Sequence, residues 1–334
     1  MNKPLKITLI VLGAIVAFLL LVFALFYMVE SIIYSDFYSR ADDEFAIPGL
    51  WGQSVPQGFE YIEEMDTFLY TGYAKDGESP SMVYIMPEGG EGKARCVELF
   101  EKDGTNFTSH VGGITVYGEY AYIADGKSLA IFELIDILNV DNKATKLDSI
   151  EIDFGVAFVE AHGDRLFAGN FYRAQDYETP ETHHITTPSG DENTAIIYEY
   201  AMNPETGYPV SIVPQRAYSI TDAIQGMTVG PNGEIFLSSS WGLTTSHIYV
   251  YKTDSAKTGK FTVPVNEIDA SFEVPLIYLD SHCLIKDIEA PPMAEEIVYH
   301  DGKIYILTEA ASMKYLFGKL TGAYNCYAYE YIED

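Results

Sequence analysis

The sequence predicts an all-β domain built from repeated four-stranded sheets and preceded by a single membrane-spanning helix. Three observations predict this fold class: an uncharged run near the N-terminus, short aromatic-rich segments bounded by Gly, Asp and Asn, and a hairpin pattern that recurs along the chain. No stretch after the N-terminal run has a long helical period. Alternating and short apolar runs dominate instead, and these are typical of strands.

The N-terminal run extends from Ile7 to Val29 and contains no charged residue. At a rise of about 1.5 Å per residue it spans a hydrocarbon core of roughly 30 Å. Lys3 and Lys6 precede the run, and acidic residues from Glu30 onward follow it. The positive-inside rule therefore predicts a cytoplasmic N-terminus and a single-pass protein of the cell membrane. A cleaved signal peptide is the alternative, although its apolar core is usually only about 7–15 residues long.

The chain beyond this helix is strongly acidic. The predicted divisions are a cytoplasmic tip, a transmembrane helix, a linker and an extracytoplasmic domain, at residues 1–6, 7–29, 30–44 and 45–334. Beyond the helix lie 18 basic and 49 acidic residues, a net charge of −31. This charge excludes nucleic acid as a general partner, because nucleic-acid binding needs a basic surface. Three cysteines, Cys96, Cys283 and Cys326, allow at most one disulfide bridge, and their spacing does not select the pair.

One hairpin pattern occurs five times. Each copy is a short strand, a tight turn containing Gly, Asp or Asn, and a second strand that ends in small or polar residues. Such turns suit antiparallel hairpins because these residues tolerate positive φ. The copies are at residues 57–62 with 68–73, 112–116 with 121–126, 156–160 with 166–170, 225–229 with 235–240, and 295–299 with 304–309.

Further apolar runs follow each hairpin and complete a four-stranded unit. They are at residues 82–86 and 94–100, 128–134 and 145–153, 195–201 and 208–217, 247–252 and 272–280, and 324–332. The fifth copy has one run, and we expect Phe45–Gly52 to supply its missing strand and close a ring. Four strands per repeat predict a five-bladed β-propeller. Six or seven blades, with a degenerate blade within 171–224 or 253–292, and a pair of β-sandwiches remain as alternatives.

The hairpin starts carry a family resemblance. Gln57-Gly58-Phe59, Gly112-Gly113-Ile114, Gln225-Gly226-Met227 and Glu295-Glu296-Ile297 are each followed by a turn and an aromatic-rich strand. Over about residues 50–332 the chain resembles the propeller superfamily of NHL-type, quinoprotein-like and streptogramin-lyase-like domains. It is also similar to glutaminyl cyclotransferase-type five-bladed propellers. It departs from them at 110–114, where His-Val-Gly-Gly-Ile stands in place of Glu-Gly and a hydrophobic residue.

One face of such a propeller collects polar side chains from separate blades, because the first strand of a hairpin starts beside the end of the second. We predict a ligand site at this channel mouth. Its residues are Gln57, Thr71, Asp125, Asn170, Gln225, Ser239 and Trp241. Trp241 is a candidate stacking platform for a sugar or another ring. A small molecule, a glycan and a protein all remain open as ligands.

The same face offers residues for catalysis or metal binding. His110, Glu295 and Glu309 are candidate catalytic residues, because imidazole and carboxyl groups exchange protons. Asp125, Glu295 and Glu309 are candidate calcium ligands, because Ca²⁺ takes oxygen ligands; acidic residues that only wet the channel are the alternative. Two functions follow: a ligand-binding propeller displayed at the membrane, or an extracytoplasmic lyase, hydrolase or cyclotransferase. The sequence contains no nucleophile-elbow, zinc-protease, phosphate-loop or EF-hand motif, which favours binding.

Overall fold

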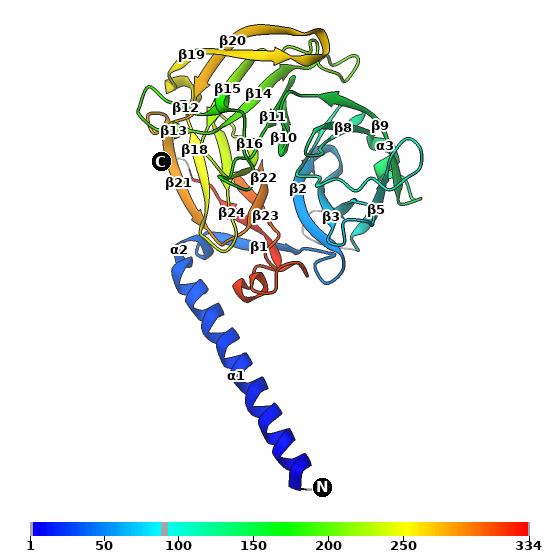
Figure 1. Ribbon diagram of the computed structural model, residues 1–334, viewed down its shortest axis with the longest axis vertical. Helices are drawn as coiled ribbons and strands as arrows, with labels where there is room; N and C mark the ends of the chain where they lie inside the picture. Colours follow the sequence, from blue (N-terminus) through cyan, green and yellow to red (C-terminus); the bar gives the residue numbers. More distant parts are fainter. Residues whose placement is uncertain (1–2, 88–92, 333–334) are drawn as a thin grey trace.

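The computed structural model describes residues 3–87 and 93–332. These residues form one long N-terminal helix, α1 (Lys3–Ile33), a short helix α2 (Ser35–Tyr38), and a domain made almost entirely of strands (Figure 1). The predicted all-β propeller behind an N-terminal apolar helix is confirmed. Within the described chain, α1 is long and apolar enough to cross a membrane over Pro4–Ile33.

The described strands form sheets of eight, six, four, four and two members, and antiparallel neighbours within the larger sheets group into four-stranded units. The first contains β2 (Ser54–Ile62), β3 (Thr67–Ala74), β4 (Met82–Pro87) and β5 (Arg95–Phe100), and the second β6 (Gly113–Tyr117), β7 (Tyr120–Ala124), β8 (Ser128–Glu133) and β9 (Lys143–Glu151). The third contains β10 (Phe158–His162), β11 (Arg165–Gly169), β14 (Ala195–Ala201) and β15 (Arg216–Ile220). The fourth contains β16 (Ile224–Val229), β17 (Ile235–Ser239), β18 (Ser246–Tyr251) and β21 (Leu284–Ala290), and the fifth β22 (Ala294–His300), β23 (Lys303–Thr308), β24 (Asn325–Glu330) and β1 (Ala41–Ala46).

The inner strands of the units form a ring. Each of β2, β6, β10, β16 and β22 contacts the inner strand of the unit on either side, and β22 contacts β2 to complete the circle. The chain closes the last unit with its own N-terminal strand, because β1 pairs antiparallel with β24. The outer strands β5 and β9 also pair in parallel and join the first two units into one sheet.

A separate hydrophobic cluster fills each gap between neighbouring units. One cluster, for example, packs Leu69 and Val83 of the first unit against Ile123 and Phe132 of the second. Another packs Phe45 of β1 with Phe68 of the first unit. Side chains on both faces of each sheet are therefore buried, which explains why the inner strands read as nearly continuous apolar runs.

Three strands differ in position from the sequence prediction. The closing strand is Ala41–Ala46 rather than Phe45–Gly52, because a turn follows Pro48 and Gly49 adopts a φ of +77°. The last strand of the fourth unit is Leu284–Ala290, whereas 272–280 lies in β20 (Ala270–Tyr278). The predicted run 208–217 overlaps β15 only at its end, since Pro209 and Pro214 cannot donate to a ladder.

The remaining elements are insertions between strands. β19 (Thr258–Val265) and β20 form a long hairpin, and β20 continues the sheet of the third unit by pairing in parallel with β15. The loop between β11 and β14 carries the two-residue strands β12 (Ile185–Thr186) and β13 (Glu192–Asn193). Short helices are α3 (Leu134–Leu138), η1 (Glu63–Met65), η3 (Glu181–His183), η4 (Thr253–Ser255), η5 (Asn266–Ile268) and η6 (Gly318–Thr321). Cys96, Cys283 and Cys326 are unpaired.

The segment interpreted as a linker, residues 30–44, contains α2 and the first part of β1. Phe37 of α2 is buried against Tyr329 of β24, with their ring centroids 5.3 Å apart. The short helix α2, which follows α1, is thus packed against the β domain.

Candidate functional site

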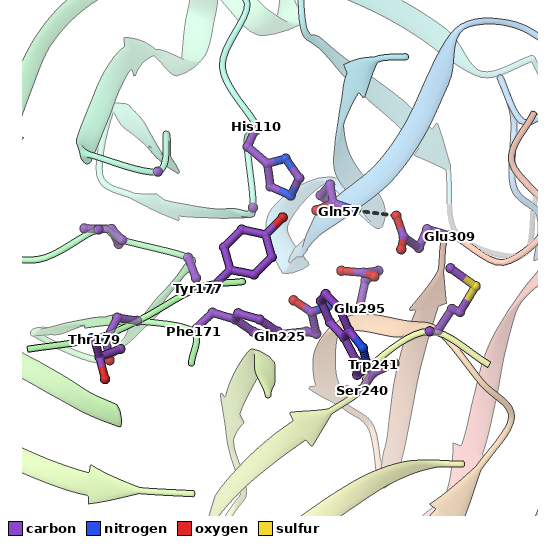
Figure 2. Close-up of a pocket in the computed structure, with 18 of the residues that line it drawn as sticks. Gln57, His110, Phe171, Tyr177, Thr179, Gln225, Ser240, Trp241, Glu295 and Glu309 are labelled. Atoms are coloured by element: carbon purple, nitrogen blue, oxygen red, sulfur yellow. Dashed lines mark hydrogen bonds between the residues drawn. The ribbon is translucent and has the colours of Figure 1, made fainter. Parts of the chain in front are cut away.

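A cavity of about 590 Å³ lies where the inner strands begin. Residues from the starts of inner strands and from the ends of second strands converge on it, as Figure 2 shows for Gln57, Gln225, Glu295 and Glu309. Loops between strands add the aromatic and cationic part of the lining, which includes Phe154, Phe171, Tyr177, Trp241, Lys314 and Tyr315. The volume lies within the range of small-molecule sites, roughly 300–1,000 Å³.

Most of the residues predicted for the site line this cavity, and three do not. Those that line it are His110, Gln57, Asn170, Gln225, Trp241, Glu295 and Glu309. Thr71 is fully buried, where its Oγ1 donates to the carbonyl of Val111 at 2.6 Å. The Asp125 carboxylate accepts bonds from the backbone N–H groups of Lys127 and Ser128. Ser239 Oγ donates to the carbonyl of Asp222 at 3.3 Å.

Two buried carboxyl groups form the centre of the site. Glu295 is the second residue of β22 and Glu309 follows β23, so the hairpin brings the two carboxyl groups into the same cavity. Two buried carboxylates close together repel each other, which favours the protonated form. Burial and the neighbouring Glu309 carboxylate raise the pKa of Glu295 well above its ordinary value. Burial raises the pKa of Glu309 to about 7, although the charge of Lys314 opposes the shift.

Hydrogen bonds hold Glu309 in place. The Nε2 of Gln57 donates to Glu309 Oε2 at 3.0 Å and also to the carbonyl of Pro56 at 2.6 Å. The Tyr315 hydroxyl bonds Glu309 as well. The bonds from Gln57 and Tyr315 to Glu309 favour its ionised carboxylate, so they oppose the rise of its pKa.

Lys314, Tyr73 and His110 form a second group beside the carboxyl pair. The Nζ of Lys314 donates to the Tyr73 hydroxyl, and the Tyr73 ring stacks on His110 with centroids 4.6 Å apart. Burial, with a smaller contribution from Lys314, lowers the pKa of His110 to about 4. His110 is therefore a neutral imidazole near pH 7 and can donate or accept a hydrogen bond without adding charge.

Aromatic rings form one wall of the cavity. Trp241 lies 6.0 Å from Phe171 and 6.1 Å from Tyr177, measured between ring centroids. The guanidinium of Arg173 sits over the Trp241 ring at 5.1 Å. In Figure 2, Trp241 and Tyr177 face the space that Gln225 and Glu295 also border. The wall therefore offers ring faces opposite hydrogen-bonding groups.

The channel is closed below the cavity. Glu296 is next along β22, and its Oε2 accepts bonds from Phe59 N and Ile114 N on two other inner strands, each at 3.1 Å. Glycines make room for this crossing, since a Cβ on Gly226 would lie 2.5 Å from the Cα of Glu296. The cavity consequently has a floor and opens at one end of the propeller.

Three residues just before inner strands have strained backbones. Val111, Ala223 and Met293 have φ values of +53°, +54° and +64° and precede β6, β16 and β22. Positive φ is unfavourable for such side chains and costs of order 1–3 kcal/mol. Met293 itself lines the cavity. The strained residues lie where these three inner strands enter the site.

The proposed calcium ligands do not form one group. Among residues 3–87 and 93–332, no three His, Cys, Asp or Glu side chains gather in a metal-binding arrangement. Glu295 and Glu309 both line the cavity, whereas the Asp125 carboxylate accepts a hydrogen bond from the backbone of Ser128 in its own turn. Asn170 lines the cavity, but its side chain bonds the Nδ1 of His183 and the backbone of Ile196.

Sequence reasoning did not single out Phe171, Tyr177 or Tyr315 for the site. Phe171 and Tyr177 belong to the long connection between β11 and β14. A loop of this length that carries aromatic residues is itself a signal of function. Tyr315 lies in the connection between β23 and β24, and no sequence pattern predicted that its hydroxyl would reach Glu309.

Comparisons with known proteins agree with this architecture. A family model for the LVIVD repeat matches residues 109–141, which include β6, β7 and β8. A search of curated proteins finds no match. Among solved structures, the chain is similar to the PQQ-bound form of aldose sugar dehydrogenase from Streptomyces coelicolor. The two are 12% identical with a TM-score of 0.45, and the alignment covers 86% of this chain and 97% of that one.

Two further solved structures are similar at the same level. For a luciferin-regenerating enzyme the identity is 11% and the TM-score 0.43, with coverage of 86% and 94%. For glutaminyl cyclase from Myxococcus xanthus the identity is 8% and the TM-score 0.38, with coverage of 80% and 91%. The ring of inner strands in this structure itself confirms the predicted propeller fold. The chain is a β-propeller protein with an apolar N-terminal helix and a lined cavity at its channel mouth.

Proposed function

We propose that the protein is a membrane-anchored receptor whose propeller binds a small, uncharged, hydroxylated ring compound, such as a sugar unit, in the 590 Å³ cavity. Its N-terminus lies in the cytoplasm and the propeller lies outside, because Lys3 and Lys6 precede the apolar helix and acidic residues follow it.

One observation carries the proposal: an aromatic wall faces a floor of hydrogen-bonding groups that are almost balanced in charge. His110 is neutral, and burial raises the pKa of both Glu295 and Glu309 and so favours their uncharged forms. The remaining negative charge is opposed by Lys314. An uncharged ligand therefore fits better than an ion, since burying an unpaired charge is costly. Hydroxyl groups suit Gln57, Gln225 and the carboxyl pair, and a ring face suits Trp241.

Intrinsic fluorescence tests the proposal, because the chain contains two tryptophans. Trp51 is 71% exposed and does not line the cavity, so Trp51→Phe leaves Trp241 as the reporter. We expect a saturable change in Trp241 emission with one or more neutral sugars. In the full chain, Trp241→Ala should weaken binding by at least about tenfold, because an aromatic anchor of an interface contributes about 2 kcal/mol.

Trp51→Ala is the matched control and should leave the affinity unchanged. If the ligand still binds with unchanged affinity after Trp241→Ala, its site is not this cavity. A panel in which charged compounds bind and neutral sugars do not would contradict the proposed ligand class.

A second candidate function is favoured by the carboxyl pair. Two neighbouring carboxyl groups with raised pKa values can supply an acid and a base in one place, as in catalytic dyads. The pair suits proton transfer in a lyase or cyclotransferase, with neutral His110 as a partner.

Glu309→Gln separates the two functions. In an enzyme, this change should lower turnover of a bound compound by about 100-fold or more, while the compound still binds. Product formation by the purified protein, followed by mass spectrometry, is the measurement. If the wild-type protein releases every bound ligand unchanged, the receptor function stands and the enzymatic one falls.

A further inference from the structure

The connection between β23 and β24 carries large apolar side chains on its surface. Met313, Leu316 and Phe317 are 42%, 74% and 66% exposed. They precede or adjoin η6, and we call residues 313–320 the apical segment. Figure 1 shows this red part of the chain on the side of the β domain from which α1 extends. Three exposed apolar side chains within five residues are unfavourable in water and indicate a contact surface.

Contacts with α1 fix the position of the apical segment along the helix axis. η6 contacts α1, and a Cβ on Gly322 would lie 2.5 Å from Cε2 of Tyr27. Tyr27 belongs to the apolar run of the helix, three residues before Glu30. A rise of 1.5 Å per residue places Tyr27 about 4.5 Å on the membrane side of Glu30. A loop that touches Tyr27 therefore reaches the boundary of the bilayer that α1 crosses.

The surroundings of the segment have the composition of a membrane interface. Trp51 stacks on Tyr324 with centroids 5.9 Å apart and an interplanar angle of 11°. The Nζ of Lys319 lies 4.2 Å from the centre of the Trp51 ring. Trp and Tyr are enriched where the hydrocarbon meets the headgroups, and Lys there extends its ammonium toward water.

From these observations we propose that the apical segment and Trp51 insert into the headgroup region of the bilayer, as a second membrane contact beside α1. The inference rests on the membrane-spanning role of α1 in the proposed function. Lys314 and Tyr315 of the same segment line the ligand cavity. The bilayer thus supports one wall of the site, and the propeller is held at a defined tilt.

Lipid quenching tests the proposal with the full chain in phosphatidylcholine vesicles. Acyl chains brominated near the headgroup quench tryptophan that lies at the interface. Trp241→Phe leaves Trp51 as the fluorophore, and Trp51→Phe leaves Trp241. We expect brominated lipid to remove most of the Trp51 emission and to leave the Trp241 emission unchanged. Leu316→Asp with Phe317→Asp should restore the Trp51 emission.

Flotation of the vesicles distinguishes the possible failures. Protein that does not float with the vesicles would refute the membrane anchor itself. Protein that floats while Trp51 and Trp241 are quenched equally would overturn the interfacial contact alone, and would leave the apical segment for a protein partner. Unchanged quenching in the double aspartate variant would also contradict insertion, provided that circular dichroism shows the variant to be folded.

Discussion

At the scale of single residues, buried glutamates surround the propeller axis. Besides Glu295, Glu296 and Glu309, Glu60 and Glu160 extend from inner strands into this region. Glu60 Oε2 accepts bonds from Thr115 Oγ1 at 2.6 Å and Val116 N at 3.0 Å. Thr228 Oγ1 in turn donates to Glu160 Oε1 and accepts from Tyr299 N. These side chains satisfy backbone groups of the next inner strand, so they tie neighbouring units together.

The glutamates predict a stability that falls as the pH rises. Burial raises the pKa of Glu60 and of Glu309 from 4.5 to about 7, and it raises the pKa values of Glu160, Glu295 and Glu296 well above their ordinary value. Between these values the folded state binds more protons than the unfolded chain, so the stabilisation is complete below pH 4.5 and is lost through pH 7. The midpoint of thermal unfolding should be several degrees higher at about pH 5 than at about pH 8.

Glu309→Gln should reduce this pH dependence, because the amide does not titrate. Glu64→Gln is the matched control, since Glu64 is exposed on η1. A midpoint that rises steadily from pH 5 to pH 8 would contradict the role of these buried carboxyl groups.

The sequence predicted much of the site at this scale because hairpin geometry places equivalent positions on one face. Gln57, Gln225 and Glu295 follow from that rule. The rule does not predict the direction in which a side chain points. For this reason Thr71, Asp125 and Ser239 were predicted for the site although they do not line the cavity. Each of these short polar groups bonds nearby backbone instead of the cavity. Neither the raised pKa values of Glu295 and Glu309 nor the neutral state of His110 follows from sequence, since both depend on burial.

At the scale of elements, β1 is the strand that closes the ring. Phe45 is 5% exposed and packs against Phe68, with ring centroids 5.5 Å apart, in the cluster between the fifth and first units. Its removal would leave a cavity at the joint between the first and last strands of the ring.

Phe45→Ala should therefore lower the free energy of unfolding by about 3–5 kcal/mol, as in other large-to-small core substitutions. Asp43→Ala on the same strand is the control, because Asp43 is exposed. Denaturant unfolding of the detergent-solubilised chain measures both. If Phe45→Ala lowered the free energy of unfolding no more than the small change expected for Asp43→Ala, β1 would be dispensable for closure.

The last strand of the fourth unit was predicted wrongly because a hairpin is inserted before it. The run 272–280 has the alternation of a strand, but alternation does not identify the neighbour. It pairs with β19 through a turn in which Asp269 has a φ of +50°. Leu284–Ala290 contains three charged residues and pairs with β18, so its half-exposed sequence is a weaker signal than the run before it.

At the scale of the whole molecule, the fold was predictable because it repeats. Five hairpins with the same turn chemistry are hard to produce by chance, and each needs neighbours on both sides to bury its two faces. The inserted hairpin β19–β20 and the packing of α2 on the last unit do not repeat, and no internal comparison could reveal them. The cavity lining combines both kinds of element, with a repeated polar floor and an inserted aromatic wall.

The pairing of β1 with β24 also fixes an order of events during synthesis. Translation delivers the membrane helix and β1 first, whereas β24 follows every other strand of the ring. The nascent chain must therefore keep β1 unpaired until the ribosome has made the final unit. During that interval β1 is an open strand edge, and such edges are prone to pair with other chains. A chaperone that shields strand edges would therefore act on this protein late, just before the ring is sealed.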